Sequence, residues 1–295
     1  MKSGSRGTRA DQGADQGVRP TTQRHEGKMG SDVNHARLCA ALAAALLYTS
    51  PAQAQSATPP PPQPDTQATA QVLMARGVEA YDAGNNSVAL DIFHQAAAMG
   101  VVNAMMYLGV MYGTGRGIDP DLNASRAWFA HAADAGNSQA MCNIGLMYYQ
   151  GLGQPKSYAE AMRWFRRSTS FGNAEAMFNV GVLYRDGLGV PANGAEALTW
   201  FKRSADAGNE AAPNAIGVLY QKGLGVPVDY AQAMSWYQRA AQAGSATALY
   251  NIGVLWEAGL GVTRDRRQAI DWYTKAAAAG NASAKAALQS LGAQE

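Results

Sequence analysis

Few side chains that could perform catalysis occur in the main body of this 295-residue chain. Histidine is the commonest general base, and after residue 54 the sequence contains only His94 and His131. These two lack the close spacing of zinc-binding histidines, and neither stands at a recurring distance from a serine and an acid. We therefore expect no catalytic residue, no metal site and no cofactor.

Two short segments are similar to ligand-binding loops but lack residues that binding requires. Residues 119–123 begin like a calcium loop, yet Ala124 stands where the turn needs glycine and Ala130 where a bidentate glutamate is needed. Residues 113–117 are glycine-rich like a phosphate loop, without the Gly-Lys-Ser/Thr that completes one. The second segment is therefore interpreted as a joint between helices.

Charge is unevenly distributed along the chain. There are 24 Lys and Arg against 22 Asp and Glu in all. Seven of the basic and four of the acidic residues precede Gln55, which leaves 17 against 18 in the remainder. A nearly neutral body lacks the many cations that contact nucleic-acid phosphates, so we expect no nucleic-acid partner.

The N-terminal residues contain a pattern typical of export. Residues 1–28 lack hydrophobic periodicity and end before a second methionine, Met29, so they are a disordered extension or reflect a mis-assigned start. An apolar run over residues 38–48, preceded by basic residues and followed by a small-residue pattern, predicts a signal peptide over residues 29–54, cleaved after Ala54. The run is shorter than the about 20 residues of a membrane helix. We expect an exported, periplasmic protein without a membrane span.

A proline-rich segment follows the predicted signal peptide. Residues 55–65 contain five prolines, which favour an extended, semi-rigid linker. The folded region is expected to begin near Thr66. Cys142 is the only cysteine after residue 54, so it cannot form an internal disulfide. The sequence leaves open whether it is a buried, inert thiol or pairs with another molecule.

One unit of 36 residues is repeated five times over residues 103–281, without insertion or deletion. A tryptophan marks each unit, at Trp128, Trp164, Trp200, Trp236 and Trp272. A first glycine column keeps the same interval, at Gly109, Gly145, Gly181, Gly217 and Gly253. A second glycine column does so as well, at Gly117, Gly153, Gly189, Gly225 and Gly261. So many coincident positions predict an array of similar structural units.

The apolar spacing within one unit predicts two helices. Apolar residues recur at steps of three and four over residues 139–150, which indicates a first helix, here called helix A. Gly145 inside it costs about 1 kcal/mol relative to alanine, so we expect a neighbouring helix too close for a side chain. A second stripe, which includes Trp164 and Phe165, predicts helix B over residues 158–171.

Helix B has a predicted cap in every unit. The capping side chains can accept a hydrogen bond from the first turn, and they are Asp121, Ser157, Asn193, Asp229 and Asp265. Four of the five units have Glu or Gln three residues later, which predicts a reciprocal capping box. In helix A of the fourth unit, Pro213 removes a backbone donor, which predicts a local bend.

Such helix pairs must stack, because one pair cannot bury its own apolar stripe. We expect an all-α solenoid in which the tryptophan column forms the seam between units. The sequence from Ala176 to Asn209 closely resembles the Sel1-like repeat family, a branch of the tetratricopeptide superfamily, and the resemblance covers residues 103–281. It implies a right-handed α-solenoid. Residues 66–102 resemble a tetratricopeptide unit that caps the N-terminal end, and residues 282–295 are expected to form a capping helix and tail.

Two adjacent positions of helix A are candidates for binding a partner. An asparagine column can bond the donor and acceptor of a peptide backbone, or be satisfied by the adjacent unit; it comprises Asn143, Asn179 and Asn251. The neighbouring position varies most between units and could set specificity; it comprises Met106, Cys142, Phe178, Asn214 and Tyr250.

A basic column on helix B is a further candidate. Its members are expected to stack about 10 Å apart on successive units; they are His131, Arg167, Arg203, Arg239 and Lys275. The column could bind an acidic partner or an anionic glycan. We favour a solvated face, in which Asp134 and Asp206 partly pair with His131 and Arg203, three residues before them on the same helix.

The resemblance implies a scaffold or adaptor for protein–protein interactions. Proteins of this family hold partners, among them regulators of envelope signalling and adaptors of membrane assemblies. We expect a protein or peptide partner. The sequence gives neither the identity of this partner nor the oligomeric state. One alternative is an envelope enzyme that binds or hydrolyses β-lactams, as has been associated with cysteine-rich relatives, but their paired cysteines are missing here. Another is a glycan- or peptidoglycan-binding module.

Overall fold

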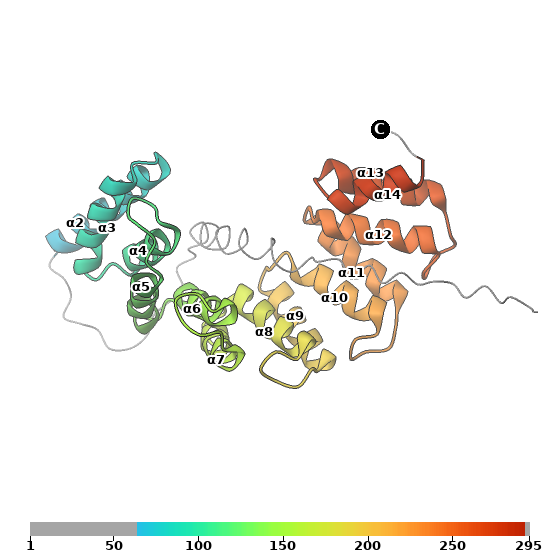
Figure 1. The fold of residues 1–295 in the computed structure, drawn as a ribbon, viewed down its shortest axis with the longest axis horizontal. Coiled ribbons are helices and arrows are strands. Elements are labelled where there is room, and N and C mark those ends of the chain that lie inside the picture. The colour runs from blue at the N-terminus through green and yellow to red at the C-terminus, as the bar shows by residue number, and fades with distance from the viewer. Residues whose placement is uncertain (1–63, 293–295) are drawn as a thin grey trace, which may run out of the picture.

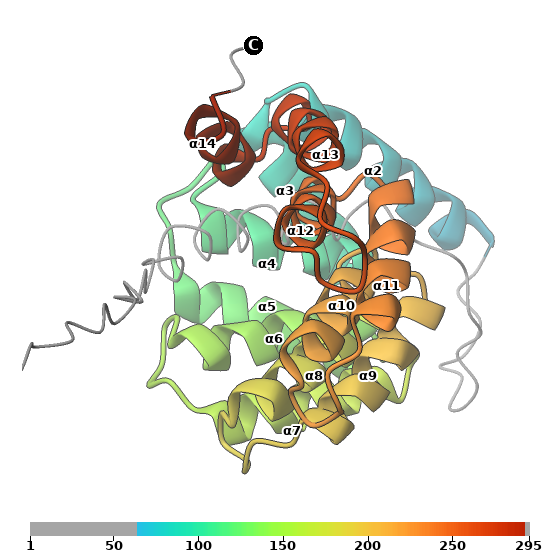
Figure 2. The same cartoon turned by 90° about the vertical axis from the view of Figure 1, so that its right-hand side faces the viewer.

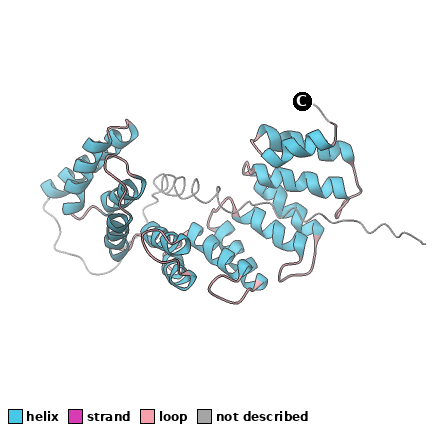
Figure 3. Cartoon of the chain, viewed as in Figure 1, coloured by secondary structure: helices cyan, strands magenta, loops and turns pink. Residues whose placement is uncertain are grey.

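The computed structural model describes residues 64–292, and all regular structure in that range is α-helical. The helices of this range are α2 (Pro64–Asp82), α3 (Asn86–Ala98), α4 (Val102–Thr114), α5 (Leu122–Asp134), α6 (Ser138–Gln150), α7 (Tyr158–Thr169), α8 (Ala174–Asp186), α9 (Gly194–Asp206), α10 (Ala212–Lys222), α11 (Tyr230–Gln242), α12 (Ala246–Ala258), α13 (Arg266–Ala278) and α14 (Ala282–Ser290). Loops and turns connect them (Figure 3). The predicted all-α fold is confirmed.

The predictions for the N-terminal segments lie largely outside the described residues. The extension (residues 1–28), the signal peptide (residues 29–54) and most of the proline-rich linker precede residue 64. Helix α2 begins at Pro64, slightly before the predicted start, because proline is tolerated in a first helical turn that needs no backbone N–H. Between residues 64 and 292, no helix has the length and apolar character to cross a membrane.

The helices stack as successive pairs into an arch (Figure 1), and in the view turned by 90° they follow one another around a common centre (Figure 2). In the five units helix A is α4, α6, α8, α10 and α12, and helix B is α5, α7, α9, α11 and α13. Helix A packs on helix B of its own unit, and helix B packs on helix A of the next. Helices α2 and α3 lie at one end of the arch and α13 and α14 at the other (Figure 1). This is the solenoid that the repeats predict.

The first glycine column makes room for a buried aromatic ring. The residue after each tryptophan is at most 1% exposed, and this buried column comprises Phe129, Phe165, Phe201, Tyr237 and Tyr273. A Cβ placed on Gly145 would lie 2.6 Å from the ring of Phe165, which is shorter than real side chains tolerate. The predicted close approach is confirmed, and its partner is helix B of the same unit. Gly77 and Phe93 make the same contact between α2 and α3, at 2.5 Å.

The second glycine column forms the joint between units. These glycines have φ between 68° and 80°, which favours glycine because other residues are strained there. The loop backbone at each one lies against the start of the preceding helix B: a Cβ on Gly153 would lie 2.7 Å from Cβ of Leu122. At Gly225 the neighbour is itself a glycine, Gly194. Main-chain contact therefore ties each unit to the one before it.

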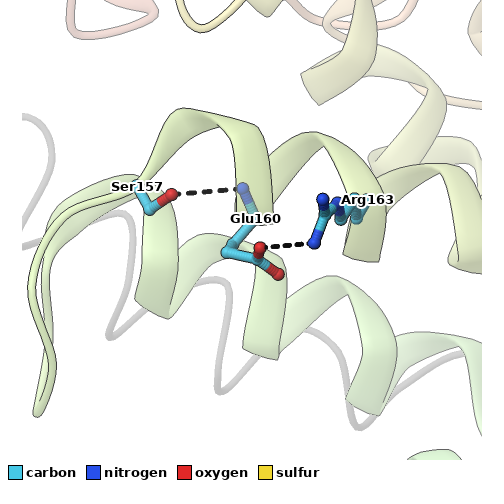
Figure 4. Close-up of polar contacts among 3 residues, drawn as sticks. All are labelled: Ser157, Glu160 and Arg163. Atoms are coloured by element: carbon cyan, nitrogen blue, oxygen red, sulfur yellow. Dashed lines mark hydrogen bonds and ion pairs between the residues drawn. The ribbon is translucent and has the colours of Figure 1, made fainter.

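All five predicted caps of helix B are confirmed. Ser157 Oγ, for example, accepts a hydrogen bond from the N–H of Glu160 at 3.3 Å (Figure 4). The reciprocal half of the capping box is wrong, because the N–H of Ser157 donates to the carbonyl of Tyr148 at 2.9 Å. The end of helix A thus supplies the acceptor. The carboxylate of Glu160 pairs with Arg163 at 2.7 Å instead (Figure 4).

The fourth helix A is shorter than the others and is not bent at its proline. Helix α10 begins at Ala212, and Pro213 lies in its first turn, where no backbone donor is needed. Asn209 Oδ1 accepts bonds from the N–H groups of Ala211 and Ala212 at 3.0 and 3.1 Å. The predicted bend at Pro213 is therefore wrong, and the proline instead marks a later start of the helix.

The joint between the N-terminal helix pair and the first unit uses an arginine. Other units have leucine where Arg116 stands. Its guanidinium donates to Asn86 Oδ1 at 3.2 Å and to the carbonyl of Tyr81 at 3.1 Å, and it lies 3.7 Å from the centre of the Tyr81 ring. The glycine-rich residues 113–117 are thus the end of a helix and a joint, as the sequence indicates.

Candidate interaction surface

The five tryptophans lie partly buried between units, beside the fully buried aromatic column. Trp164, for example, packs on a cluster that joins α4, α5 and α6 and contains Met106, Phe129 and Ile144. The spacing predicts equal burial for Trp164 and Phe165, and the structure buries only the phenylalanine completely. The indole keeps one face toward the surface, where a basic side chain covers it.

The basic column lies over these indole rings. The guanidinium carbons of Arg167, Arg203 and Arg239 are 5.2, 4.2 and 5.2 Å from the centres of the rings three residues before them. Lys275 Nζ lies 4.3 Å from the ring of Trp272, and His131 takes the same place beside Trp128 with ring centres 5.7 Å apart. At exposed sites such a cation–π contact contributes about 0.5 to 1 kcal/mol.

Two of the basic side chains also reach the preceding unit. Arg167 lies 3.5 Å from the carboxylate of Asp134 and 3.5 Å from the carbonyl of Ala133, near the end of α5. Arg239 makes the equivalent contacts with the end of α9. Cations are favourable at helix C-termini, where carbonyls lack partners. The expected pairs within one helix, His131 with Asp134 and Arg203 with Asp206, are wrong, because the two carboxylates pair with the arginines of the next unit. The placement favours a solvated, partly paired column over a site for an anionic ligand.

The asparagine column differs in exposure along the array. Asn143 is 1% exposed; its Oδ1 accepts a weak bond from Gln139 at 3.4 Å, and its Nδ2 has no partner among the described residues. Asn179 and Asn251 are partly exposed. Asn179 and Asn251 are therefore open to solvent, whereas Asn143 is enclosed.

Two partly exposed amides on neighbouring helices lie side by side. Asn251 Nδ2 on α12 donates to Asn214 Oδ1 on α10 at 3.0 Å. This bond leaves Asn214 Nδ2 as a donor and Asn251 Oδ1 as an acceptor. Tyr250 stands next to the pair, with its ring 5.4 Å from that of Tyr273. Further along the array Phe178 lies beside Asn179, with its ring 5.2 Å from that of Phe201.

We call these five partly exposed residues of α8, α10 and α12 the A-helix face: Phe178, Asn179, Asn214, Tyr250 and Asn251. Aromatic rings supply contact area at low cost in conformational entropy, and paired amides supply hydrogen bonds of both directions. The arrangement suits a peptide segment. Of the predicted candidates on helix A, the structure brings Asn214 and Asn251 into contact beside Tyr250, whereas Phe178 and Asn179 lie on α8 and Asn143 is buried.

Cys142 lies in the core between α6 and α8 and is 0% exposed. Burial raises the pKa of its thiol well above the usual value, and the charge of Glu175 adds to the shift. Asn179 Nδ2 lies 3.9 Å from the sulfur, at the limit of a weak hydrogen bond. A neutral, buried thiol is a poor nucleophile. This placement favours the inert interpretation over an intermolecular disulfide.

The two histidines do not form a catalytic group with other side chains. His94 Nε2 lies 3.2 Å from the hydroxyl of Tyr112 and its ring packs on Trp128, while His131 is exposed. Within residues 64–292 no three His, Cys, Asp or Glu side chains come close enough to hold a metal ion.

In each of the last two units, a polar contact that the residue spacing does not predict joins helix A and helix B. The buried hydroxyl of Tyr237 donates to Gln221 Oε1 at 2.5 Å, and that of Tyr273 donates to Glu257 Oε2 at 2.6 Å. The available signal was a change from Phe to Tyr that coincides with Gln or Glu sixteen residues earlier.

The family model described as Sel1 repeat matches five stretches of the chain: residues 102–137, 138–170, 174–209, 212–245 and 246–281. These stretches coincide closely with the five units and cover more than half of the sequence. No curated protein matches the chain.

Solved structures show the same architecture. A Sel1 repeat protein from Oxalobacter formigenes is 34% identical with a TM-score of 0.69, and the match covers 75% of this chain and 90% of that one. A protective antigen present in uropathogenic Escherichia coli strains, described as having an SLR fold, is 29% identical with a TM-score of 0.64. That match covers 74% of this chain and 47% of the antigen, so the chain spans about half of the antigen's length.

Proposed function

This chain belongs to the Sel1 repeat family, and from that membership we propose that it is a scaffold whose A-helix face docks a segment of a partner protein. Sel1 repeats commonly serve as protein-interaction scaffolds and are generally not enzymes. The observation that supports this face is the amide pair of Asn214 and Asn251, which leaves one donor and one acceptor beside Tyr250.

The proposed occupant is an extended peptide or the edge of a partner's helix. Its main-chain N–H would donate to Asn251 Oδ1 and its carbonyl would accept from Asn214 Nδ2, while an apolar side chain packs on Tyr250 or Phe178. Asn179 on α8 lies two units before its equivalent Asn251, so a longer segment that reaches it gains contacts along the arch.

A photo-crosslinking residue placed at two positions tests the face. At Tyr250 it is expected to capture a discrete partner in intact cells, and at Arg163, exposed on α7, it is expected to capture none. Equal capture at both positions would count against a specific face.

Amide substitutions give the second test. Asn214→Asp with Asn251→Asp replaces both donors by acceptors and brings two charges together, so binding of the captured partner should weaken by about tenfold or more, about 1.4 kcal/mol. Asn123→Asp, exposed on α5, is the matched control. Circular dichroism should show the same helicity for all three proteins. Unchanged affinity of the double variant would exclude the amide pair.

We further propose that the scaffold is exported and serves a signalling or assembly complex of the cell envelope. The support is the apolar run of residues 38–48 with its small-residue pattern. N-terminal sequencing of the mature protein should begin at Gln55. A mature protein that retains residues 29–54 and fractionates with the cytoplasm would refute export.

A further inference from the structure

The end of the arch formed by α2 and α3 differs from every internal joint. In the second unit, three residues of helix A that face the preceding unit are buried and apolar. They are Ala140, Ile144 and Met147, which are 0, 2 and 3% exposed. The first helix pair has no preceding unit in the described chain, so the equivalent positions of α2 lie at the end of the described array.

Aligning Gly77 with Gly145 identifies those positions in α2. They are occupied by Val72, Arg76 and Glu79, and all three are exposed. Val72 is 57% exposed, and Val88 on the adjacent α3 is 51% exposed. Charged side chains, Arg76 and Glu79, thus stand where the second unit has buried apolar ones. Val72 and Val88 on the same two helices are apolar and exposed.

Three of these residues, Arg76, Glu79 and Val88, border a shallow hollow between α2 and α3. Its other lining residues are Ala80 from α2, Ala83 and Asn85 from the turn that follows, and Ile92 from α3. Its surface is mixed: the charged Arg76 and Glu79 lie about one helical turn apart on α2, beside the apolar Val88 and Ile92 of α3. A helix that carries both charged and apolar side chains, as α2 itself does, suits a hollow of this chemistry.

The charges on α2 of one copy are complementary to those on α2 of a second copy. Arg76 and Glu79 have opposite sign, and neither side chain has an ion-pair or hydrogen-bond partner within residues 64–292. If two copies of α2 pack antiparallel across a two-fold axis, Arg76 of each copy faces Glu79 of the other, so two ion pairs form and every charge has a partner. A helix of 19 residues offers about 28 Å of length for such packing. Two-fold contacts are closed, so they yield a dimer and not a filament.

We propose that this end face, formed by Val72, Arg76, Glu79 and Val88, binds a second copy of the chain across a two-fold axis. The dimer joins two arches at their N-terminal ends. It leaves the A-helix face of each copy free, so it does not depend on the proposed function.

Sedimentation of the purified mature protein over a range of concentrations tests the dimer. The unchanged protein should sediment as a dimer at micromolar concentration. Val72→Asp with Val88→Asp should weaken dimerisation by about a hundredfold or more, because it places four charges at an apolar contact. Arg163→Glu, on the exposed surface of α7, should leave it unchanged.

Charge reversal identifies the two-fold geometry. Arg76→Glu alone and Glu79→Arg alone should each weaken the dimer by about tenfold, since exposed pairs contribute up to about 1 kcal/mol each. Mixing the two single variants should restore it as a heterodimer, in which every opposed pair again has opposite sign.

Three outcomes would overturn the proposal. The first is a monomer at all concentrations, which indicates that the chain's own N-terminal residues or solvent cover this face. The second is a dimer that survives the double aspartate variant, which places the contact elsewhere. The third is a mixture of the single variants that stays monomeric, which excludes the antiparallel pairing.

Discussion

The first three Sel1 units and the last two fill the same core position with different rings. The first three bury Phe129, Phe165 and Phe201, whereas the last two bury Tyr237 and Tyr273. Both tyrosine hydroxyls find an acceptor on helix A of their own unit, at Gln221 and Glu257. The phenylalanine units have Gly113, Tyr149 and Arg185 at the acceptor's position.

This difference shows that two positions of the unit vary together. A buried hydroxyl without an acceptor costs about 1 to 3 kcal/mol, so tyrosine is tolerated only where helix A offers an oxygen. The glycine that faces the ring is the same in both groups of units. The shape of the core is therefore constant along the array, and its polarity is not.

The largest effect is expected from placing a hydroxyl in a phenylalanine unit. Phe165→Tyr should lower the free energy of unfolding by about 2 to 3 kcal/mol, because Tyr149, which packs near that ring, offers crowding and no carboxamide oxygen. Urea denaturation followed by tryptophan fluorescence measures the loss.

Adding an acceptor should reverse part of that loss. Phe165→Tyr combined with Tyr149→Gln reproduces the arrangement of Tyr237 and Gln221 and should recover at least half of the stability. If the double variant is as unstable as the sum of the two single variants, the two positions are independent and the comparison fails.

A smaller loss is expected when the acceptor is removed from a tyrosine unit. Glu257→Ala should destabilise by about 2 kcal/mol, because the hydroxyl of Tyr273 is left buried and unpaired. Glu257→Gln keeps an oxygen and should cost much less. Glu210→Ala, exposed before α10, is the matched control and should be neutral. Equal stability of the three variants would contradict the role of the bond.

Removing the tyrosine hydroxyl should lower the free energy of unfolding less than removing its acceptor does. Tyr237→Phe converts the fourth unit to the chemistry of the first three and should lose about 1 kcal/mol, the net contribution of one hydrogen bond. Gln221 is partly exposed and can bond water instead. Hydrogen exchange of the amides in α10 and α11 should report the change locally; a loss spread evenly over all units would argue for a different cause.

The smallest effect is expected in alkaline solution. Burial raises the pKa of Tyr237, and burial together with Glu257 raises that of Tyr273, above the unfolded value of about 10. The folded state then holds protons that the unfolded state loses, so stability is complete below pH about 10 and falls above it. At pH about 10.5 each tyrosine should account for a loss on the order of 1 kcal/mol or less. The double variant Tyr237→Phe with Tyr273→Phe should show a flatter decline, and an identical decline would refute the shift.

The repeat, the helices and the caps could be predicted because they depend on local spacing. A step of 36 residues, glycine inside helix A and a cap before helix B are visible in the letters alone. The close approach at Gly145 could be predicted as well, because glycine inside a helix destabilises it and is expected where a neighbouring helix leaves no room for a side chain.

Burial within a stripe could not be predicted from spacing. Trp164 and Phe165 are adjacent on one helix, and only the packing against α6 decides that the second is enclosed and the first is not. The burial of Asn143, unlike Asn179 at the same position of the next unit, depends likewise on neighbouring side chains. The capping box failed because the carbonyl of Tyr148 belongs to another helix, which a local motif does not contain.

The glycine joints have a consequence for how such a chain can change its length. At its second-column glycine, each loop lies with its main chain against the start of the preceding helix B. Unequal crossing-over between two copies of the 36-residue segment would add or remove one whole unit while creating a joint of the same kind. The length of the array can therefore change by whole units while the interface between neighbouring units stays the same.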